Sequence, residues 1–278
     1  MKVVKSVADL KAALANCPKE GIGFVPTMGA LHRGHRSLVE RARQENETVV
    51  VSVFVNPTQF NDKNDLKNYP RTPEADCAIL EAAGADVVFM PTVEDIYPEP
   101  DTRVFDFGLV DKVMEGATRP GHFNGVAQVV SRLFALVNPQ RAYFGEKDFQ
   151  QIAVIKAMVA QLAIEVDIVE CAIVRGEDGL ALSSRNELLT PEHRKAAPHI
   201  YATISQCAAK MESMTPSELT AWVVETIDSN PLLKTIYFEA VDAKTMQKVE
   251  AWSDSERIQG CCAVQAGDIR LIDNIRIK

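Results

Sequence analysis

The sequence predicts an α/β protein whose first two-thirds form a doubly wound parallel sheet. Short runs rich in β-branched residues alternate with helical patterns through this part of the chain. Several runs are apolar at every position, which is typical of strands that helices cover on both faces of a parallel sheet. After about residue 176 the pattern changes to helices followed by strands, so a second, smaller α+β domain is expected.

Five segments are predicted to be strands of the parallel sheet. They are residues 22–26, 48–57, 85–91, 140–145 and 165–175. In open α/β sheets, ligands bind outside the carboxyl ends of the strands. We therefore expect the functional residues to follow these segments directly.

The helices between these strands have recognisable ends. An N-cap threonine, a proline at the first helical position and a glycine after the last turn predict a helix over 73–83. Valines and leucines spaced by three and four predict a helix over 125–137, which an Asn-Pro pair ends. Asp148 is expected to cap a further helix whose apolar residues include Ile152 and Ile155.

The C-terminal part is predicted to contain helices that begin at Thr-Pro pairs. One begins at Thr190, and the other begins at Thr215, where Glu218 completes a capping box. Strands are expected around 236–243, 261–265 and 269–277.

The predicted domains are 1–175 and 176–278. The joining stretch from Arg175 to Asn186 is rich in glycine, serine and charged residues, so we expect a mobile loop there.

Composition argues against several classes of protein. A chain of 278 residues buries a core without disulfides, and its six cysteines form no CxxC pair, so we expect reduced thiols in the cytoplasm and no zinc site. The formal net charge of −8 argues against nucleic acid as the main partner. We expect no membrane association, because no segment is apolar enough to span a bilayer and the start lacks the apolar region of a signal peptide.

The stretch FVPTMGALHRGHRSLVERA, residues 24–42, is predicted to run from a buried strand through a glycine turn into an amphipathic helix. Unpaired backbone N–H groups and the helix dipole make such a turn an anion site. His32 and His35 share a helix face at this spacing, and Gly34 lets a base or phosphate approach the backbone. The alternative is an ordinary turn with two surface histidines.

Two better-known phosphate motifs do not fit this turn. Gly29 and Gly34 have the spacing of a P-loop, but His35 and Arg36 stand where lysine and serine or threonine are required. A GxGxxG fingerprint is also absent. The turn instead has the HxGH pattern of nucleotidylyltransferases and class I aminoacyl-tRNA synthetases, in which the histidines stabilise charge on an α-phosphate.

Six segments of the chain then share their order and spacing with one enzyme family. They are GFVPTMGALHRGH, VSVFVNPTQF, YPRTPEAD, RPGHFNGVAQVV, YFGEKDFQQ and DGLALSSRN. In these segments, from about residue 20 to 190, the chain resembles the pantothenate synthetases, which are ATP-dependent pantoate–β-alanine ligases. The resemblance implies a Rossmann-like domain with a small C-terminal lid domain, and usually a homodimer. It also implies that pantoate and Mg·ATP form pantoyl adenylate and pyrophosphate, after which β-alanine displaces AMP.

The resemblance also implies which residues bind ATP. His32, His35, Lys147 and Arg185 are the expected catalytic residues, with His35 as the proton donor, and losing one should raise the barrier by about 3 kcal/mol. Without the context of the family, a solvated surface lysine is the default interpretation of Lys147. Further expected ATP contacts are Met28, Gly29, Gly34, Gly145, Glu146, Asp148, Val174, Leu182, Ser183 and Ser184. The Leu182 to Arg185 stretch is expected to close over the adenylate and exclude water.

For the other substrates, Gln59 and Gln151 are the expected pantoate contacts, with Gln59 also touching β-alanine. Asn56 and Met28 are placed in the same site. Neutral amides suit pantoate because they donate and accept at once. Asp76 is the expected Mg²⁺ ligand, although an acid in the first turn of a helix also suits the helix dipole alone. Tyr69, Arg119 and His122 lie in family-like segments but have no assigned chemistry.

Three alternatives to a ligase stay open at this point. A nucleotidylyltransferase that moves AMP onto a phosphate acceptor would share the HxGH turn. A tRNA-charging enzyme would also share it, although the acidic charge argues against that activity. A non-catalytic nucleotide-binding protein could keep the same fold.

Overall fold

The computed structural model describes residues 1–61 and 63–278, and the chain divides into two compact units. The first unit comprises Met1–Phe107, Thr118–Glu146 and Val154–Ala172, and the second comprises Gly108–Ala117, Lys147–Ala153 and Ile173–Lys278. In the part of the chain that is described, no helix has the length and apolar character needed to cross a membrane.

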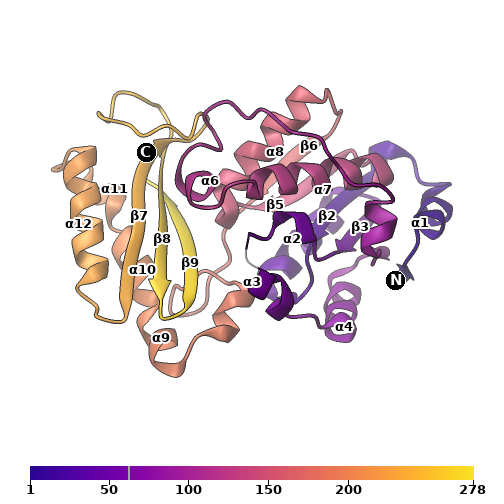
Figure 1. Ribbon diagram of the computed structural model, residues 1–278, viewed down its shortest axis with the longest axis horizontal. Coiled ribbons are helices and arrows are strands. Elements are labelled where there is room, and N and C mark those ends of the chain that lie inside the picture. Colours follow the sequence, from indigo (N-terminus) through magenta and orange to yellow (C-terminus); the bar gives the residue numbers. More distant parts are fainter. Residues whose placement is uncertain (62) are drawn as a thin grey trace. The chain divides into compact units, whose positions relative to one another are not determined.

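The first unit is built on a six-stranded parallel sheet (Figure 1) with the order β1-β4-β3-β2-β5-β6. Its strands are β1 Lys2–Val4, β2 Ile22–Thr27, β3 Thr48–Val53, β4 Val87–Phe89, β5 Arg141–Gly145 and β6 Asp167–Cys171. The predicted α/β fold is confirmed, and each of the five predicted strands is present. β1 was not predicted, because its three residues lie in a stretch whose charged and apolar residues alternate at helical spacing.

The strand order of this sheet reverses beside β2. The chain passes from β2 to β3 and β4 on one side and then returns to the other side of β2 with β5. Ligands of open α/β sheets bind at the carboxyl ends of the strands where the order reverses. The segments that follow Thr27 and Gly145 are therefore the places to look for a functional site.

Helices cover both faces of the sheet. They are α1 Val7–Leu14, α2 Arg33–Glu45, α3 Lys63–Asn68, α4 Pro73–Ala83, α5 Val93–Ile96, α7 His122–Val137 and the latter part of α8 Phe149–Gln161, with 3-10 turns at η1 Lys19–Gly21 and η2 Pro57–Gln59. Val25 of β2 packs with Val39 of α2 and Leu80 of α4. On the opposite face of the same strand, the ring of Phe24 lies 6.2 Å from the ring of Phe134 of α7. This two-sided burial explains why the strands are apolar at successive positions.

Local signals predicted the helix ends well. The helix over 73–83 is confirmed, and Gly84 follows it with a φ of +90°, which a residue with a side chain rarely adopts. Helix α7 begins three residues before the predicted start at 125 and ends where Asn138 turns to a φ of +48°. Asp148 lies in the 3-10 turn η3 Glu146–Asp148, directly before α8.

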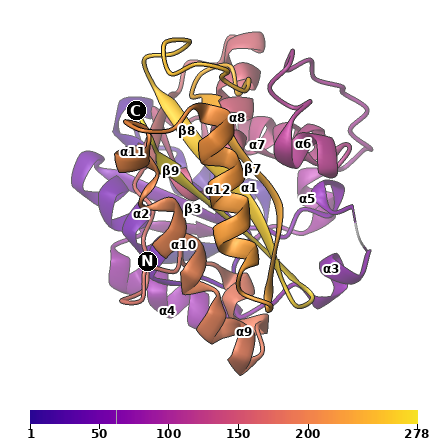
Figure 2. The ribbon, with the colours of Figure 1, turned by 90° about the vertical axis from the view of Figure 1, so that its left-hand side faces the viewer.

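The second unit contains an antiparallel sheet of β7 Leu233–Asp242, β8 Ile258–Ala266 and β9 Ile269–Arg276, in that order. Its helical segments are α6 Met114–Thr118, η4 Ser184–Leu188, α9 Pro191–Ala196, α10 Pro198–Ile204, α11 Cys207–Lys210 and α12 Pro216–Asp228. Figure 2 shows α10 and α12 in front of this sheet, and their side chains share one core with it. The predicted capping box is confirmed, because Glu218 accepts from the Thr215 N–H at 2.8 Å and donates its own N–H to Thr215 Oγ1 at 3.3 Å.

Long-range hydrogen bonds assign two short segments to the second unit. The Gln150 amide donates to the carbonyls of Val110 and Val113 at 2.8 and 2.9 Å, and its oxygen accepts from the Glu115 N–H at 3.0 Å. The Glu115 carboxylate in turn accepts from the Tyr237 hydroxyl at 3.0 Å. The predicted boundary at residue 175 lies close to the last junction between the units, at 172, but local sequence gave no sign of these two segments.

Candidate active site

Two histidines form a reciprocal cap at the start of α2. Nδ1 of His32 accepts the N–H of Gly34 at 3.1 Å, and Nδ1 of His35 accepts the N–H of His32 at 3.3 Å. A ring nitrogen that accepts a hydrogen bond carries no proton, so the proton of each neutral ring is on Nε2. The ring centroids are 4.1 Å apart, so the two imidazoles lie side by side at the start of α2.

The turn between β2 and α2 is held by Asp76 of α4. The backbone N–H of Ala30 donates to Oδ2 at 3.1 Å, and the backbone N–H of Leu31 donates to Oδ1 at 2.8 Å. The hydroxyl of Thr72 also donates to Oδ1, at 3.1 Å. A Cβ added at Gly29, whose φ is +82°, would lie 2.9 Å from Oδ2. The close approach of the carboxylate and the backbone conformation both require glycine at this position.

These contacts correct the expectation that unpaired backbone N–H groups of the turn bind the anion. The N–H groups of Ala30, Leu31, His32 and Gly34 all donate to side chains of the protein. These four amides are therefore already used within the protein. The prediction was wrong because side chains cap this helix, and one of the capping side chains lies far away in the sequence.

Asp76 does not fit the expected role of a Mg²⁺ ligand. It is 1% exposed, and its two oxygens already accept three hydrogen bonds. Mg²⁺ prefers six oxygen ligands in octahedral geometry, several of them waters. A carboxylate that is buried and already accepts three hydrogen bonds does not suit that coordination. Among the side chains that the structure describes, no group of three or more His, Cys, Asp or Glu residues could hold a metal ion.

The structure brings Met28, Asn56 and Gln59 together beside the carboxyl ends of β2 and β3. The Gln59 amide nitrogen lies 3.0 Å from the Met28 sulfur, and its oxygen accepts from the Asn56 amide at 3.2 Å. Gln59 is the last residue of η2, which Asn56 caps, so the short 3-10 turn directs its side chain back toward the turn that follows β2.

Helix α7 fixes the position of η2. The ring of His122 bonds to the backbone oxygen of Gln59 at 2.8 Å and to Arg119 at 3.1 Å. A Cβ added at Gly125 would lie 2.4 Å from the Thr58 carbonyl oxygen, so only glycine allows α7 to approach η2 this closely. These contacts supply the structural role that the sequence left open for Arg119 and His122.

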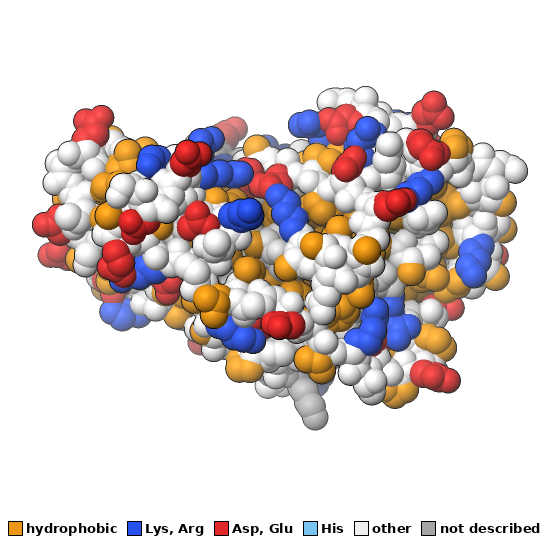
Figure 3. All heavy atoms as spheres, turned by 90° about the horizontal axis from the view of Figure 1, so that it is seen from above, with side chains coloured by type: hydrophobic (Ala, Val, Ile, Leu, Met, Phe, Trp, Pro, Cys, Tyr) orange, Lys and Arg blue, Asp and Glu red, His pale blue; other side chains and the backbone are white. Residues whose placement is uncertain are grey.

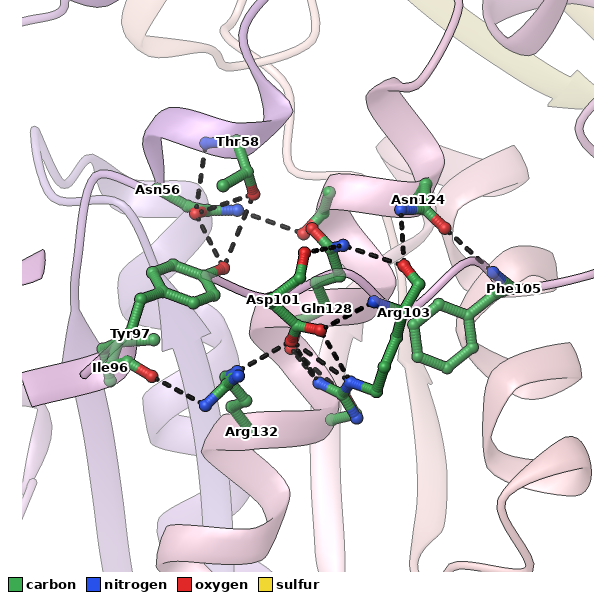
Figure 4. A network of polar contacts seen from close by, with 12 residues as sticks. Asn56, Thr58, Ile96, Tyr97, Asp101, Arg103, Phe105, Asn124, Gln128 and Arg132 are labelled. Carbon is green, nitrogen blue, oxygen red and sulfur yellow. Dashed lines mark hydrogen bonds and ion pairs between the residues drawn. The ribbon is translucent and has the colours of Figure 1, made fainter. Parts of the chain in front are cut away.

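A polar network around the Asp101 carboxylate, between residues 97–103 and α7, was not predicted at all (Figure 4). The Asp101 carboxylate accepts from Arg103 Nη2 at 2.6 Å and from Arg132 Nε at 2.7 Å. These hydrogen bonds, that of Arg103 first, hold the pKa of Asp101 well below its usual range although burial opposes the shift. The network ends at Tyr97, whose hydroxyl donates to Asn56 at 3.0 Å. No motif marks these residues, because Arg132 lies 31 residues from Asp101 and Asn56 lies 41 residues from Tyr97.

In the second unit, one strand holds both predicted phosphate-binding segments. Asn274 of β9 donates its amide to the backbone oxygen of Lys147 at 3.0 Å. Its neighbour Asp273 pairs with Arg175 at 2.6 Å, and the Arg175 guanidinium lies 3.8 Å from the centre of the Tyr201 ring. Two adjacent residues of β9 therefore hold these segments: Asn274 bonds to the backbone of Lys147, and Asp273 pairs with the side chain of Arg175.

The stretch from 174 to 182 folds back on itself as a hydrogen-bonded hairpin and leads into η4, and its mobility stays a prediction. The N–H of Leu182 donates to the Val174 carbonyl at 3.0 Å, and the Asn186 amide donates to the Ala181 carbonyl at 3.0 Å. Ser183 begins η4, and its Oγ accepts the N–H of Arg185 at 3.3 Å. Because Ser183 uses its oxygen as the acceptor, its hydroxyl proton can be donated to a ligand.

Comparison with known proteins decides between the open alternatives. The family model for pantoate–β-alanine ligase matches residues 2–276. A pantothenate synthetase of Porphyromonas gingivalis is 57% identical over 280 residues, with all of both chains covered, and one of Bacteroides fragilis is 55% identical, with 100% and 99% covered. The chain belongs to the pantoate–β-alanine ligase family. It is therefore an ATP-dependent ligase that joins pantoate to β-alanine and forms pantothenate. The predicted ligase is confirmed, and the transferase and the non-catalytic binder gain no support.

Solved structures of the family agree with this fold. Pantothenate synthetase from Thermus thermophilus has a TM-score of 0.94 at 47% identity and covers 100% of this chain and 99% of its own. A pantoate–β-alanine ligase from Francisella tularensis, complexed with beta-gamma ATP and β-alanine, has a TM-score of 0.83 at 37% identity, with 100% and 98% covered.

Within the ligase, the predicted site residues fall into two groups. The first unit carries the histidines and the Met28, Asn56 and Gln59 cluster, together with Gly145 and Glu146 at the end of β5. The second unit carries Lys147, Asp148, Gln151, Val174 and the segment from Leu182 to Arg185. That both groups bind the same triphosphate stays a prediction. Figure 3 shows acidic and basic side chains intermixed on the face it draws.

Proposed function

We propose that this ligase activates pantoate as pantoyl adenylate and that His32 and His35 stabilise the phosphate during that step. The observation that carries the proposal is the reciprocal cap, in which each Nδ1 accepts a backbone N–H, so that the ring proton of each neutral histidine is on Nε2. Attack of a carboxylate on ATP brings two anions together, so donors are needed where charge develops on the α-phosphate. His35 is proposed to donate its hydrogen bond or proton to the transferred phosphate.

The acid is proposed to bind against the amides of Gln59 and Gln151, near Met28. In the structure the Gln59 NH₂ group faces the Met28 thioether at 3.0 Å, and a thioether is a weak acceptor. An oxygen of pantoate would therefore replace the sulfur at little cost. A site built from amides also selects against acids that lack the matching hydroxyl, because its own polar groups would be left unpaired.

Lys147 and Arg185 are proposed to bind phosphate oxygens of ATP, together with the hydroxyls of Ser183 and Ser184. Mg²⁺ is proposed to enter as part of the substrate Mg·ATP. The hydrogen bonds that hold the Lys147 carbonyl and cap η4 at Ser183 support these positions. The further nucleotide contacts are proposed to be Met28, Gly29, Gly34, Gly145, Glu146, Asp148, Val174 and Leu182.

In the second step, the β-alanine amine attacks the acyl carbon of the adenylate, and the bond to AMP breaks as the amide forms. Gln59 is proposed to contact β-alanine as well.

We further propose a cytoplasmic homodimer, as the family resemblance implies. Sedimentation at micromolar concentration tests the dimer, and a single species at the mass of one chain would overturn it.

Exchange of labelled pyrophosphate into ATP tests the adenylate step. The enzyme should exchange label when pantoate and Mg·ATP are present and β-alanine is absent, because adenylate formation is then complete and reversible. A nucleotidylyltransferase acting on a phosphate acceptor should show no dependence on pantoate. Exchange that begins only when β-alanine is added would overturn the adenylate intermediate.

A further inference from the structure

The Asn56 side chain can adopt only one amide orientation. A backbone N–H only donates and a backbone carbonyl only accepts. The N–H of Thr58 lies 3.4 Å from Asn56 Oδ1, and the carbonyl of Gly125 lies 3.1 Å from Asn56 Nδ2. A flipped amide would face a donor with a donor and an acceptor with an acceptor. The oxygen of Asn56 therefore faces η2, and its nitrogen faces α7.

Asn56 in turn fixes the amide of Gln59. The second N–H of Asn56 Nδ2 requires an acceptor, and the Gln59 oxygen supplies it at 3.2 Å. The Gln59 nitrogen must then face the other way, toward Met28. Asn56 is only 1% exposed, and both its oxygen and its nitrogen are bonded within the protein, so its influence on a substrate passes through Gln59.

Tyr97 holds the amide of Asn56 in this orientation. Its hydroxyl donates to Asn56 Oδ1 at 3.0 Å, beside the Thr58 hydroxyl, which donates to the same oxygen at 3.1 Å. The Arg132 guanidinium lies 5.1 Å from the centre of the Tyr97 ring, and Asp101 and the carbonyl of Ile96 hold that guanidinium at 2.7 and 3.1 Å (Figure 4). Burial raises the pKa of Tyr97, so its hydroxyl stays a donor at neutral pH.

We propose that Tyr97 is a positioning residue for the acid substrate: it fixes Asn56, and Asn56 turns the NH₂ group of Gln59 toward an oxygen of pantoate. The inference rests on the proposed role of Gln59 as a pantoate contact. It adds a determinant of specificity, since the site then offers a donor at this point and favours acids that place a hydroxyl or carboxylate oxygen there. A carbonyl oxygen of Gln59 at the same point would repel a carboxylate oxygen and would require a hydroxyl to donate instead.

The variant Tyr97→Phe removes only the hydroxyl and keeps the ring under Arg132. We expect the KM for pantoate to rise about 5- to 10-fold, the value for one lost neutral hydrogen bond, while the KM for ATP changes less than about twofold. Tyr143→Phe is the matched control. Tyr143 is another buried tyrosine of the first unit, and its hydroxyl is bonded to Asn46 at 2.6 Å and to Glu45 at 2.9 Å. Its loss should leave the pantoate KM unchanged.

A double-mutant cycle separates positioning from a general structural role. In a Gln59→Ala background, Tyr97→Phe should add less than about twofold, because the group that it positions is gone. The same 5- to 10-fold effect in both backgrounds would overturn the proposal. If Gln59→Ala alone leaves the pantoate KM unchanged, the proposed role of Gln59 fails. If Gln59→Ala raises it and Tyr97→Phe does not, only the positioning role of Tyr97 fails.

Thr58→Val gives a second route if Tyr97→Phe does not fold. It removes the other hydroxyl that donates to Asn56 Oδ1 and keeps the backbone N–H. We expect the pantoate KM to rise about 2- to 5-fold in wild type and to stay constant in the Gln59→Ala background. No change in wild type would argue that the orientation of Asn56 does not affect acid binding.

Discussion

Leu31 donates its backbone N–H to Oδ1 of Asp76 at 2.8 Å, and this bond ties the turn after β2 to the first turn of α4. Ala30 donates to the other oxygen of the same carboxylate. The turn that carries both histidines is thus shaped by a carboxylate of the protein itself. This arrangement gives Asp76 a structural role that is independent of any metal.

The variant Asp76→Asn tests that role. An amide can keep an acceptor for Leu31 and Thr72, but its NH₂ group then faces the N–H of Ala30. A buried donor without an acceptor costs about 1–3 kcal/mol, so the free energy of unfolding in urea should fall by that amount. The Mg²⁺ concentration for half-maximal pyrophosphate exchange should stay the same.

Glu74→Gln is the control for this measurement, because Glu74 is exposed in the first turn of the same helix. It should change stability by less than about 0.5 kcal/mol. A variant Asp76→Asn with normal stability but a weakened Mg²⁺ dependence would restore the metal role and remove the structural one.

The start of α2 also shows how much of the site is local in sequence. The spacing of His32 and His35 was sufficient to predict a shared face at a helix start. Their use as caps depends on backbone angles, and the partnership with Asp76 joins positions 46 residues apart. No local pattern contains either fact. The sequence therefore did not show that backbone N–H groups of this turn are bonded to side chains of the protein.

The same distinction applies to the fold. The ends of α4 and α12 were predicted because Thr-Pro starts, Gly84 and the Thr215 capping box act within one turn. The assignment of Gln150 to the second unit depends on carbonyls 37 and 40 residues earlier. The tether between Asn274 and Lys147 spans 127 residues. Such contacts become visible only when the chain is folded.

Lys147→Ala should abolish pyrophosphate exchange while the protein stays folded. Loss of one preorganised positive donor costs about 3 kcal/mol, so the exchange rate should fall roughly 100-fold or more. Only the Lys147 backbone oxygen is used in the tether to Asn274, and alanine keeps that oxygen. The thermal midpoint should therefore stay near that of the wild type.

Lys156→Ala is the control for Lys147→Ala. Lys156 lies in α8 and pairs with Glu170 near the surface, where such pairs contribute less than about 1 kcal/mol. It should keep the wild-type exchange rate. Full exchange by Lys147→Ala would remove Lys147 from the mechanism.

Two substitutions of His35 separate its cap from its chemistry. In His35→Asn, the amide oxygen takes the place of Nδ1 and accepts the N–H of His32, but nothing replaces Nε2–H. In His35→Ala, both functions are lost. Both variants should lower the exchange rate at least about 100-fold, whereas only His35→Ala should lose the roughly 0.5–2 kcal/mol of a helix cap. Paired kinetic and urea-unfolding measurements would show this, and a fast His35→Asn enzyme would exclude Nε2–H as the donor.

The buried carboxylate of Asp101 makes a prediction about pH. Hydrogen bonds from Arg103 and Arg132 hold its folded-state pKa well below the unfolded value of about 4. A group with a depressed folded pKa contributes stability above its unfolded pKa and loses it as the pH falls toward the folded pKa. Asp101→Asn should therefore cost about 2 kcal/mol at pH 7 and at pH 5, the value for hydrogen bonds to a charged group. The difference from wild type should shrink below about pH 4.

Urea unfolding at pH 7, 5, 4 and 3 measures this difference. Glu99→Gln is a suitable comparison, because Glu99 is exposed in the same segment two residues before Asp101. Its effect should stay within about 0.5 kcal/mol at every pH. A cost of Asp101→Asn that stays constant to pH 3 would mean that the carboxylate is not protonated on unfolding in this range, which contradicts the linkage. A cost that grows as the pH falls would mean that the folded state raises the pKa of Asp101, and the network around Tyr97 would then not be held by an ionised carboxylate.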